Sequence, residues 1–156
     1  MLKNILKELL ILKKAVKKLK NIGVTVITHM IIGLPFENEK MIVETADFIG
    51  RSGADGIKLQ LLHVLKGTDL EKDYLAGKFE VLSLEKYTEI LKKCLAVLPP
   101  DMVVHRMTGD GDKKKLIAPL WSADKKKVLN YCRIFWIWRK STRTDSFLSV
   151  TWTPEL

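Results

Sequence analysis

The sequence predicts an α/β fold in which parallel strands form a sheet, either open or part of a barrel. Helix-like and strand-like segments alternate along the chain, and each connection between strands is long enough for a right-handed crossover. The first strand-like run is almost entirely apolar and rich in β-branched residues, which is typical of strands in parallel sheets. These observations favour a helix–strand–helix–strand–helix–strand order.

The chain opens with a segment that we expect to be an amphipathic helix, residues 2–20. Apolar residues recur there at spacings of three and four, and lysines fill most of the other positions. Asn21 and Gly23 supply the stop signal. Residues 24–32 then read as a strand buried on both faces, which ends at Gly33.

The pattern repeats in the middle of the chain. Residues 38–52 read as a helix with apolar residues at helical spacing, and residues 57–64 read as a second strand. A looser stretch, 65–82, contains a short helical piece near 69–76.

A further helix and strand complete the order. Ser83 is expected to cap a helix that runs to about Leu98, with Glu85 in its first turn. Two prolines stop this helix, and residues 102–106 read as the third strand.

The composition describes a globular chain of one domain. It has 156 residues, 47% of them apolar, and a length sufficient for a real core. Lys and Arg number 27 against 18 Asp and Glu, so the net charge of +9 favours an acidic partner such as RNA, DNA or anionic lipid. No apolar run approaches the roughly 20 residues that span a bilayer, and we expect a cytoplasmic protein.

Cysteine and histidine usage limits the possible chemistry. Cys94 and Cys132 are the two cysteines, which excludes a disulfide framework and an iron–sulfur cluster held by three local cysteines. The three histidines lack the spacing of a metal site, so we expect no metal ligands. No order of residues stands out for nucleophilic catalysis, and catalytic residues stay unassigned.

The last 25 residues, 132–156, differ from the rest because they hold three of the four tryptophans and show no usable period. A shifted reading frame would explain this, since the codons permit a helix-like Leu-x-x-x-Leu-Asp-Leu-Glu segment one base back. A genuine aromatic, basic tail is the alternative. We therefore expect a domain over residues 1–131 and an atypical tail over 132–156.

Polar residues and glycines gather where the predicted strands end, which is where parallel α/β folds bind ligands. They comprise Gly33, Leu34, Pro35, Phe36, Glu37 and Asn38 after the first strand, His63, Lys66, Gly67 and Thr68 after the second, and His105, Arg106, Thr108, Gly109, Asp110, Gly111 and Asp112 after the third.

Each candidate also has a purely structural interpretation. The glycine and proline after the first strand also suit a simple turn, and His29 is more typical of a core histidine than of a ligand. His63 and His105 suit acid–base work or ligand binding. Residues 108–111 have the composition of a phosphate-binding loop without its spacing, and a turn explains them as well. The lysine runs at 113–115 and 125–127 are either a solvated face or an RNA contact.

Four strings resemble a known family in the order in which they occur. They are THMIIGLPFE (28–37), GADGIKLQLLHVLKGTDL (53–70), LPPDMVVHRMTGDG (98–111) and LIAPLWS (116–122). Over residues 11–131 the chain is similar to the carboxyl-terminal half of radical S-adenosylmethionine (radical SAM) enzymes, in the elongator-like group typified by the YhcC and YtqA proteins.

The resemblance implies the last three β/α units of a partial (β/α)6 barrel. In such enzymes a Cys-x3-Cys-x2-Cys loop near the start of the barrel binds a [4Fe–4S] cluster. Reductive cleavage of S-adenosylmethionine at the cluster gives a 5′-deoxyadenosyl radical that abstracts a substrate hydrogen. Related proteins are linked to modification of the wobble uridine of tRNA, which makes tRNA the implied partner.

The resemblance also assigns roles to residues of this chain. The implied cofactor contacts are Ile32, Gly33, Leu34, Pro35, Lys58 and His63. The implied substrate-side residues are Lys66, His105, Arg106, Thr108, Asp110 and Gly111.

Departures from the family pattern are equally informative. The cysteine loop and the first three strands are absent from this chain, and half a barrel leaves an unpaired strand edge. Phe36 stands where the family usually has glycine, although a phenylalanine does not adopt a positive φ cheaply. Gln60 replaces a frequent histidine, and Asp112 replaces a common proline.

We therefore expect a fragment of a radical SAM enzyme that neither assembles the cluster nor cleaves S-adenosylmethionine alone, with neither group bound tightly. One alternative is a stand-alone basic α/β module that binds RNA or an anionic surface. Another is a partner subunit that completes a barrel whose cluster half is a separate chain.

Overall fold

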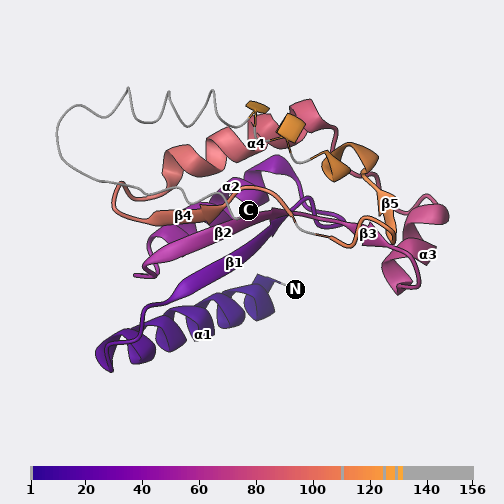
Figure 1. Cartoon of the computed structure of the whole chain (residues 1–156). Coiled ribbons are helices and arrows are strands. Elements are labelled where there is room, and N and C mark those ends of the chain that lie inside the picture. Colours follow the sequence, from indigo (N-terminus) through magenta and orange to yellow (C-terminus); the bar gives the residue numbers. More distant parts are fainter. Residues whose placement is uncertain (1, 110, 125, 129, 132–156) are drawn as a thin grey trace.

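The computed structural model describes residues 2–109, 111–124, 126–128, 130 and 131 (Figure 1). The elements in chain order are α1 (Leu2–Asn21), β1 (Ile27–Ile32), α2 (Glu39–Gly50), β2 (Gly56–Leu61), β3 (Val64–Leu65), α3 (Asp69–Leu75), α4 (Leu84–Val97), β4 (Val103–Arg106), β5 (Leu116–Ala118) and a 3₁₀ turn (Leu120–Ala123). The proposed tail, 132–156, lies outside the described residues.

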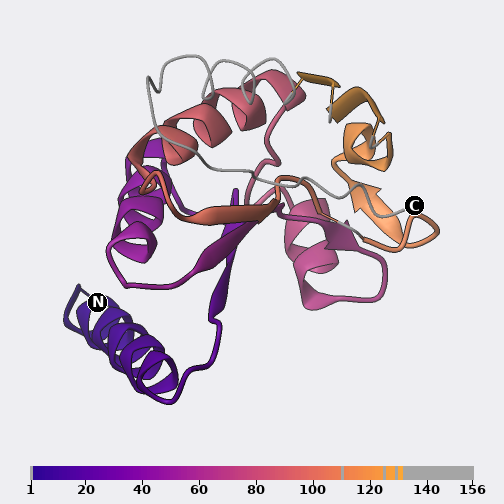
Figure 2. The ribbon, with the colours of Figure 1, turned by 60° about the vertical axis from the view of Figure 1, so that its left-hand side comes forward.

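The main sheet has the order β1-β2-β4, and both neighbouring pairs are parallel. Helices α2 and α4 lie on the same side of it, as both ribbon views show (Figures 1 and 2). The α/β class with a parallel sheet is therefore confirmed. In the described part of the chain, β1 has a strand neighbour on one side only.

The prediction that the first strand is buried on both faces is wrong. Buried and accessible residues alternate along β1, and His29 and Ile31 are exposed. The reason is that α2 and α4 cover one face of the sheet, whereas no described element covers the other at β1. The interpretation of His29 as a core histidine fails for the same reason.

The second strand is also shorter than predicted. β2 ends at Leu61, and the next residues form β3, which pairs antiparallel with β5 in a separate two-stranded sheet. The hydrophobic pattern of the sequence does not predict this pairing, because β3 and β5 are only two and three residues long.

Side-chain caps fix the starts of three helices. The Ser83 hydroxyl accepts a hydrogen bond from the Lys86 backbone N–H at 3.1 Å, which confirms the predicted cap of α4. Asn38 and Thr68 cap α2 and α3 in the same way. These caps satisfy backbone donors that have no partner inside the helix.

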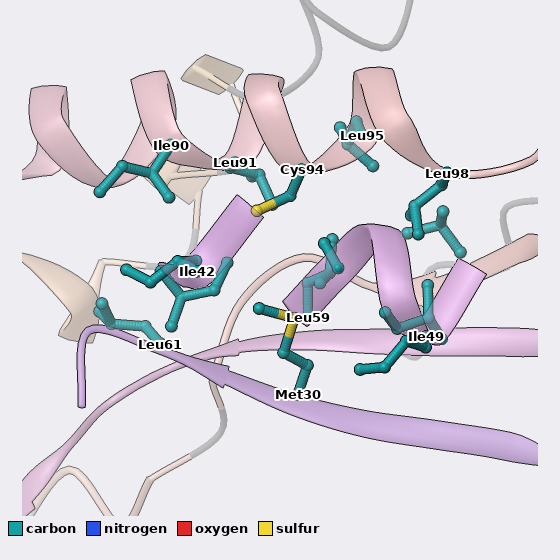
Figure 3. Close-up of a cluster of buried hydrophobic side chains, with 14 of the residues drawn as sticks. Met30, Ile42, Ile49, Leu59, Leu61, Ile90, Leu91, Cys94, Leu95 and Leu98 are labelled. Carbon is teal, nitrogen blue, oxygen red and sulfur yellow. The ribbon is translucent and has the colours of Figure 1, made fainter. Parts of the chain in front are cut away.

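The core lies between the sheet and the two helices (Figure 3). Leu59 and Met30 point from the strands toward α2, where Ile42 and Ile49 meet them, and α4 closes the layer from above. Cys94 belongs to this apolar layer.

Among the described side chains, Val16 and Leu12 pack helix α1 against the core, and an ion pair to Asp55 adds to this contact. Val16 is buried in the core cluster, and Asp55 pairs with Lys20 while its second oxygen accepts from the Val26 backbone N–H at 2.8 Å. Gly23 ends the helix region with a positive φ, as its sequence position indicated. None of the helices within the described residues is long and apolar enough to cross a membrane.

Candidate functional site

The open face of the main sheet carries polar side chains from neighbouring strands. His29 of β1 is the register partner of Lys58 of β2, and Ile31 is the partner of Gln60. Lys58 is in turn the register partner of Arg106 of β4. Alternate residues of a strand share a face, so this face combines imidazole, ammonium and amide groups.

His105 joins this face through its contact with a glycine. A Cβ on Gly56 would lie 2.8 Å from two atoms of the His105 ring, so the imidazole occupies the space that a side chain at position 56 would need. Gly56 is two residues from Lys58 and therefore lies on the same face of β2. The structure thus places Lys58 and His105, two of the predicted site residues, on the same face of the sheet.

His63 is held by the loop that follows β4. A Cβ on Gly109 would lie 2.4 Å from the Cε1 atom of His63, and one on Gly111 would lie 2.6 Å from its Nδ1 atom. At either position a Cβ would require the His63 ring to move, because side-chain Cβ atoms do not approach other atoms this closely. A small pocket adjoins the ring, lined also by Lys113 and Ser122.

This contact explains the glycines of the Thr108–Gly111 string. They make room for an imidazole, a role that neither the phosphate-loop nor the simple-turn interpretation contained. The sequence pattern placed Gly109 among the residues after the third strand but gave no reason for a glycine there, because its contact is with a residue far away in the sequence.

Not all predicted site residues converge. Lys66 lies at the end of the small sheet, where its backbone N–H donates to the Lys115 carbonyl at 2.8 Å. Arg106, the last residue of β4, and Thr108, two residues further along, are half-buried. Asp110 lies outside the described residues.

A second group of contacts holds the loop after β4 in place, and these contacts were not predicted from the sequence. The Tyr87 hydroxyl of α4 donates to the Met107 carbonyl at 2.7 Å, and the Tyr87 ring lies 5.7 Å from the Trp121 ring. The Trp121 indole N–H donates to the Leu82 carbonyl at 3.0 Å. No sequence pattern signals these ties, which connect segments distant along the chain.

Residues 33–37 form a tight loop at the carboxyl end of β1. The Glu37 backbone N–H donates to the Leu34 carbonyl at 3.2 Å, with Pro35 and Phe36 at the two central positions of the turn. Phe36 has a φ of 68°. Such a turn favours glycine at this place, because the left-handed conformation costs a residue with a Cβ about 1 kcal/mol or more.

The remaining loop residues contribute mainly backbone. Ile32 is fully buried, and its carbonyl accepts from the Leu62 N–H at 3.0 Å. Gly33 has a positive φ, and a Cβ there would lie 3.0 Å from the Leu82 side chain. The predicted contact of this backbone with a cofactor stays a prediction.

Glu37 is the acidic group of this loop. Its Oε2 atom is buried and has no hydrogen-bond partner among the described residues. Burial raises the pKa of the Glu37 carboxyl above its ordinary value, against a smaller lowering by a backbone hydrogen bond.

The described residues do not fit an iron–sulfur cluster. Such a cluster is bound by several thiolates, and the cysteine in this part of the chain, Cys94, lies in the core. Burial raises the pKa of its thiol to about 12, so it stays protonated at neutral pH. Among the described residues, no three His, Cys, Asp or Glu side chains are grouped to hold a metal ion. Cys132 lies outside them.

The chain folds into a parallel α/β domain. Its candidate ligand-binding residues lie on the open face of the main sheet and at the carboxyl ends of the three strands. Comparison with known proteins identifies its family. The family described as the radical SAM C-terminal domain matches residues 54–134, about half of the chain. The chain therefore belongs to this family.

The relatives are longer proteins. YtqA of Bacillus subtilis is 44% identical over 116 residues, which cover 74% of this chain and 36% of YtqA. YhcC of Escherichia coli is 35% identical over 99 residues, which cover 64% of this chain and 32% of YhcC. The chain thus spans about a third of the length of these curated relatives.

A solved structure supports the fold. The archaeal Methanocaldococcus infernus Elp3 with an N-terminal deletion matches 84% of this chain and 30% of its own, with a TM-score of 0.60 and 19% identity. Because the identity is low, this likeness concerns the fold.

Proposed function

We propose that this chain supplies the carboxyl-terminal strands of a radical SAM barrel, whose open face receives S-adenosylmethionine and the substrate. Lys58 and His63 would contact the cofactor, together with the backbone of residues 32–35. His105, Arg106 and Thr108 would face the substrate. The cluster, which supplies the electron for cleavage in the family, would be held by residues outside this chain.

The observation that carries this proposal is the division of the main sheet into two unlike faces. One face is packed against α2 and α4, whereas the other presents His29, Lys58 and His105 without a described element above it at β1. In α/β barrels the carboxyl ends of the strands and the loops that follow them form the site, and a few polar side chains there orient the ligand. Membership of the radical SAM C-terminal family supports the proposal that this face binds S-adenosylmethionine.

We further propose a tRNA substrate in the cytoplasm, modified at the wobble uridine. The net charge of +9 supports a polyanionic substrate, because lysines and arginines attract phosphates over long distances. The Elp3 likeness is compatible with this choice.

A chimera tests the proposal. The part of B. subtilis YtqA that precedes the matched region would be joined ahead of α1, and the product reconstituted anaerobically with iron and sulfide. We expect about four irons per chain and release of 5′-deoxyadenosine from S-adenosylmethionine. The 156-residue chain alone should give neither.

Single substitutions in the chimera locate the site. Lys58→Gln should raise the KM for S-adenosylmethionine, because the open face loses a cation. Lys92→Gln is the matched control, since Lys92 is exposed on α4, away from the open face, and it should leave this KM unchanged. A folded chimera that carries the cluster but makes no 5′-deoxyadenosine would contradict the proposal.

A basic binding module is the second candidate function, favoured by the exposed lysines of α1. Lys13, Lys14, Lys17 and Lys18 are all exposed in a single helix. Binding of tRNA to the isolated chain should then weaken steeply with salt, because released counterions drive such binding. Salt-insensitive binding, or none by a folded sample, would remove this candidate.

A further inference from the structure

Helix α1 presents lysines on the side that points away from the rest of the molecule. Val16 is buried in the core cluster, and Lys14 and Lys18, each two positions from it, lie about 200° around the helix, on the opposite side. Both ribbon views place α1 at the periphery, beyond β1 (Figures 1 and 2). The four exposed lysines of this side form what we call the basic face of α1: Lys13, Lys14, Lys17 and Lys18.

The charge of the basic face is not balanced by the carboxylates around it. Helix α1 has seven lysines and one acidic residue, Glu8. Among the described residues, the ion pair made by α1 joins Lys20 to Asp55, and no carboxylate pairs with a lysine of the basic face. This part of the surface therefore attracts anionic groups.

Apolar side chains share this side of the helix. Leu10 is 56% exposed and Ile11 is 57% exposed. They lie four and three positions before Lys14, so both are helical neighbours of that lysine. The core-facing side of α1 already packs through Leu12 and Val16, and the two outer residues leave their apolar surface in water. The exposed side of α1 thus combines cations with apolar groups.

This combination favours a lipid surface over RNA. The sequence of α1 contains no arginine and no aromatic residue, the side chains that bind phosphates in a bidentate way and stack on bases. A lysine can lay its alkyl stem along apolar surface while its ammonium group stays at the level of the lipid headgroups. Exposed leucine and isoleucine gain nothing from a phosphate backbone, whereas they can enter the boundary between headgroups and acyl chains.

We propose that α1 binds the surface of a bilayer that contains anionic phospholipids. The lysines of the basic face contact the lipid phosphates, and Leu10 and Ile11 enter the boundary with the acyl chains. The helix lies in the plane of the bilayer, since no helix among the described residues is long and apolar enough to cross it. The proposal concerns α1 alone and does not depend on the chemistry proposed for the open face.

Flotation of the 156-residue protein with lipid vesicles tests this proposal. One set of vesicles consists of phosphatidylcholine, and the other contains phosphatidylcholine and phosphatidylglycerol in equal amounts. We expect the protein to float with the anionic vesicles and not with the neutral ones. The affinity should fall as salt is added, because the attraction between lysines and headgroups is screened.

A pair of lysine substitutions tests the basic face itself. Lys14→Gln combined with Lys18→Gln should weaken binding to the anionic vesicles at least about ten-fold, because each lysine near an anionic surface strengthens binding several-fold. Lys40→Gln combined with Lys92→Gln is the matched control, since it removes the same charge from exposed positions on α2 and α4. The control should weaken binding by less than about two-fold, because charges away from the surface are screened.

A pair of apolar substitutions distinguishes lipid from RNA. Leu10→Ser combined with Ile11→Ser should weaken vesicle binding about ten-fold, because it removes the side chains that enter the acyl boundary. Binding of tRNA should stay unchanged in this variant, since lysines and not alkyl groups contact phosphates. Both side chains are exposed, so the circular dichroism spectrum and melting temperature should match those of the parent protein.

The results separate lipid binding from the other possibilities. No preference for anionic vesicles, equal losses in the two lysine pairs, or full vesicle binding after Leu10→Ser with Ile11→Ser would each overturn the proposal. If the protein ignores vesicles but binds tRNA through Lys14 and Lys18, the basic face belongs to RNA. Release of 5′-deoxyadenosine by the chimera is a separate result, because it does not involve α1 at a bilayer.

Discussion

The two faces of the main sheet differ in what their side chains do. Toward α2 and α4, residues such as Met30 and Leu59 are buried among other apolar side chains (Figure 3). On the opposite face, His29 and His105 are exposed and Lys58 is half-buried. The same strands therefore stabilise the fold with one set of alternate residues and offer ligand-binding groups with the other.

This difference means that stability and function should respond to substitutions at neighbouring positions in opposite ways. The covered face tolerates little change in volume, because it is closely packed. We expect the side chains of the open face to contribute little to the free energy of unfolding, so that they can serve ligand binding. The two faces can be separated experimentally because they interleave residue by residue along β1 and β2.

The largest effect is expected from a cavity in the covered face. Leu59→Ala should lower the free energy of unfolding by about 3 kcal/mol, since Leu59 is fully buried between β2 and the helices. His29→Ala, on the open face, should change it by less than about 0.5 kcal/mol. Urea denaturation followed by circular dichroism measures both, and comparable losses would mean that the two faces are not distinct.

Local chemistry explains which elements could be predicted from the sequence. Ser83 marks the start of α4 because a hydroxyl cap acts within one turn, and apolar periodicity marks α2 in the same way. The burial of β1 could not be predicted, because a run of β-branched residues does not reveal whether one or two layers cover it. β3 and β5 are too short to show any period.

The sequence predicted where along the chain candidate site residues gather but not which residues contact one another. It placed His63 and His105 at strand ends, whereas β2 ends at Leu61 and His105 lies within β4. The reason for Gly56 and Gly109, each facing an imidazole from another segment, depends on tertiary packing. The backbone conformation of Phe36 was not predictable either, because a positive φ is unfavourable for phenylalanine.

The second largest effect on stability is expected at Gly109, which contacts the His63 ring. Gly109→Ala should destabilise the protein by about 1–3 kcal/mol, because its Cβ would lie 2.4 Å from the His63 ring. In a His63→Ala background the same substitution should cost much less, since the ring is gone. Thermal unfolding of the four proteins in this double-mutant cycle measures the coupling.

Gly77→Ala is a control for glycine replacement in general. A Cβ there meets nothing within 4 Å, so any cost comes from its positive φ alone, and His63→Ala should leave that cost unchanged. If Gly109→Ala is equally harmful with and without His63, the imidazole is not the reason for the glycine.

A smaller effect is expected at Glu37, in the loop that follows β1. Its folded pKa is raised by burial, so stability should fall as pH rises from about its ordinary value of 4.5 through the raised folded value. Glu37→Gln removes the buried charge and should raise stability at pH 7 by up to about 1 kcal/mol. The difference should vanish below the ordinary pKa, and a difference independent of pH would show that the charge is not the cause.

The smallest effect concerns the ion pairs that join α2 to α4 on the surface of the covered side. Glu39 pairs with Lys86 at 2.6 Å and with Lys93, and hydrogen bonds from these lysines lower its pKa. A lowered pKa means that the contribution is present above the ordinary value and is lost as pH falls through the folded value. Since the groups are solvated, Glu39→Gln should lower the melting temperature by only about 1–2 °C at pH 7 and less in high salt.

Glu44 provides the matched comparison because it belongs to the same helix. Its pair with Lys40, at 3.7 Å, lies within α2 and joins no second element. Glu44→Gln should therefore leave the melting temperature unchanged within error. Equal shifts for the two variants would mean that Glu39 acts through the charge of α2 alone. A shift confined to Glu39→Gln would show that its lysine contacts help to hold α4 against α2, and with it the covered face of the sheet.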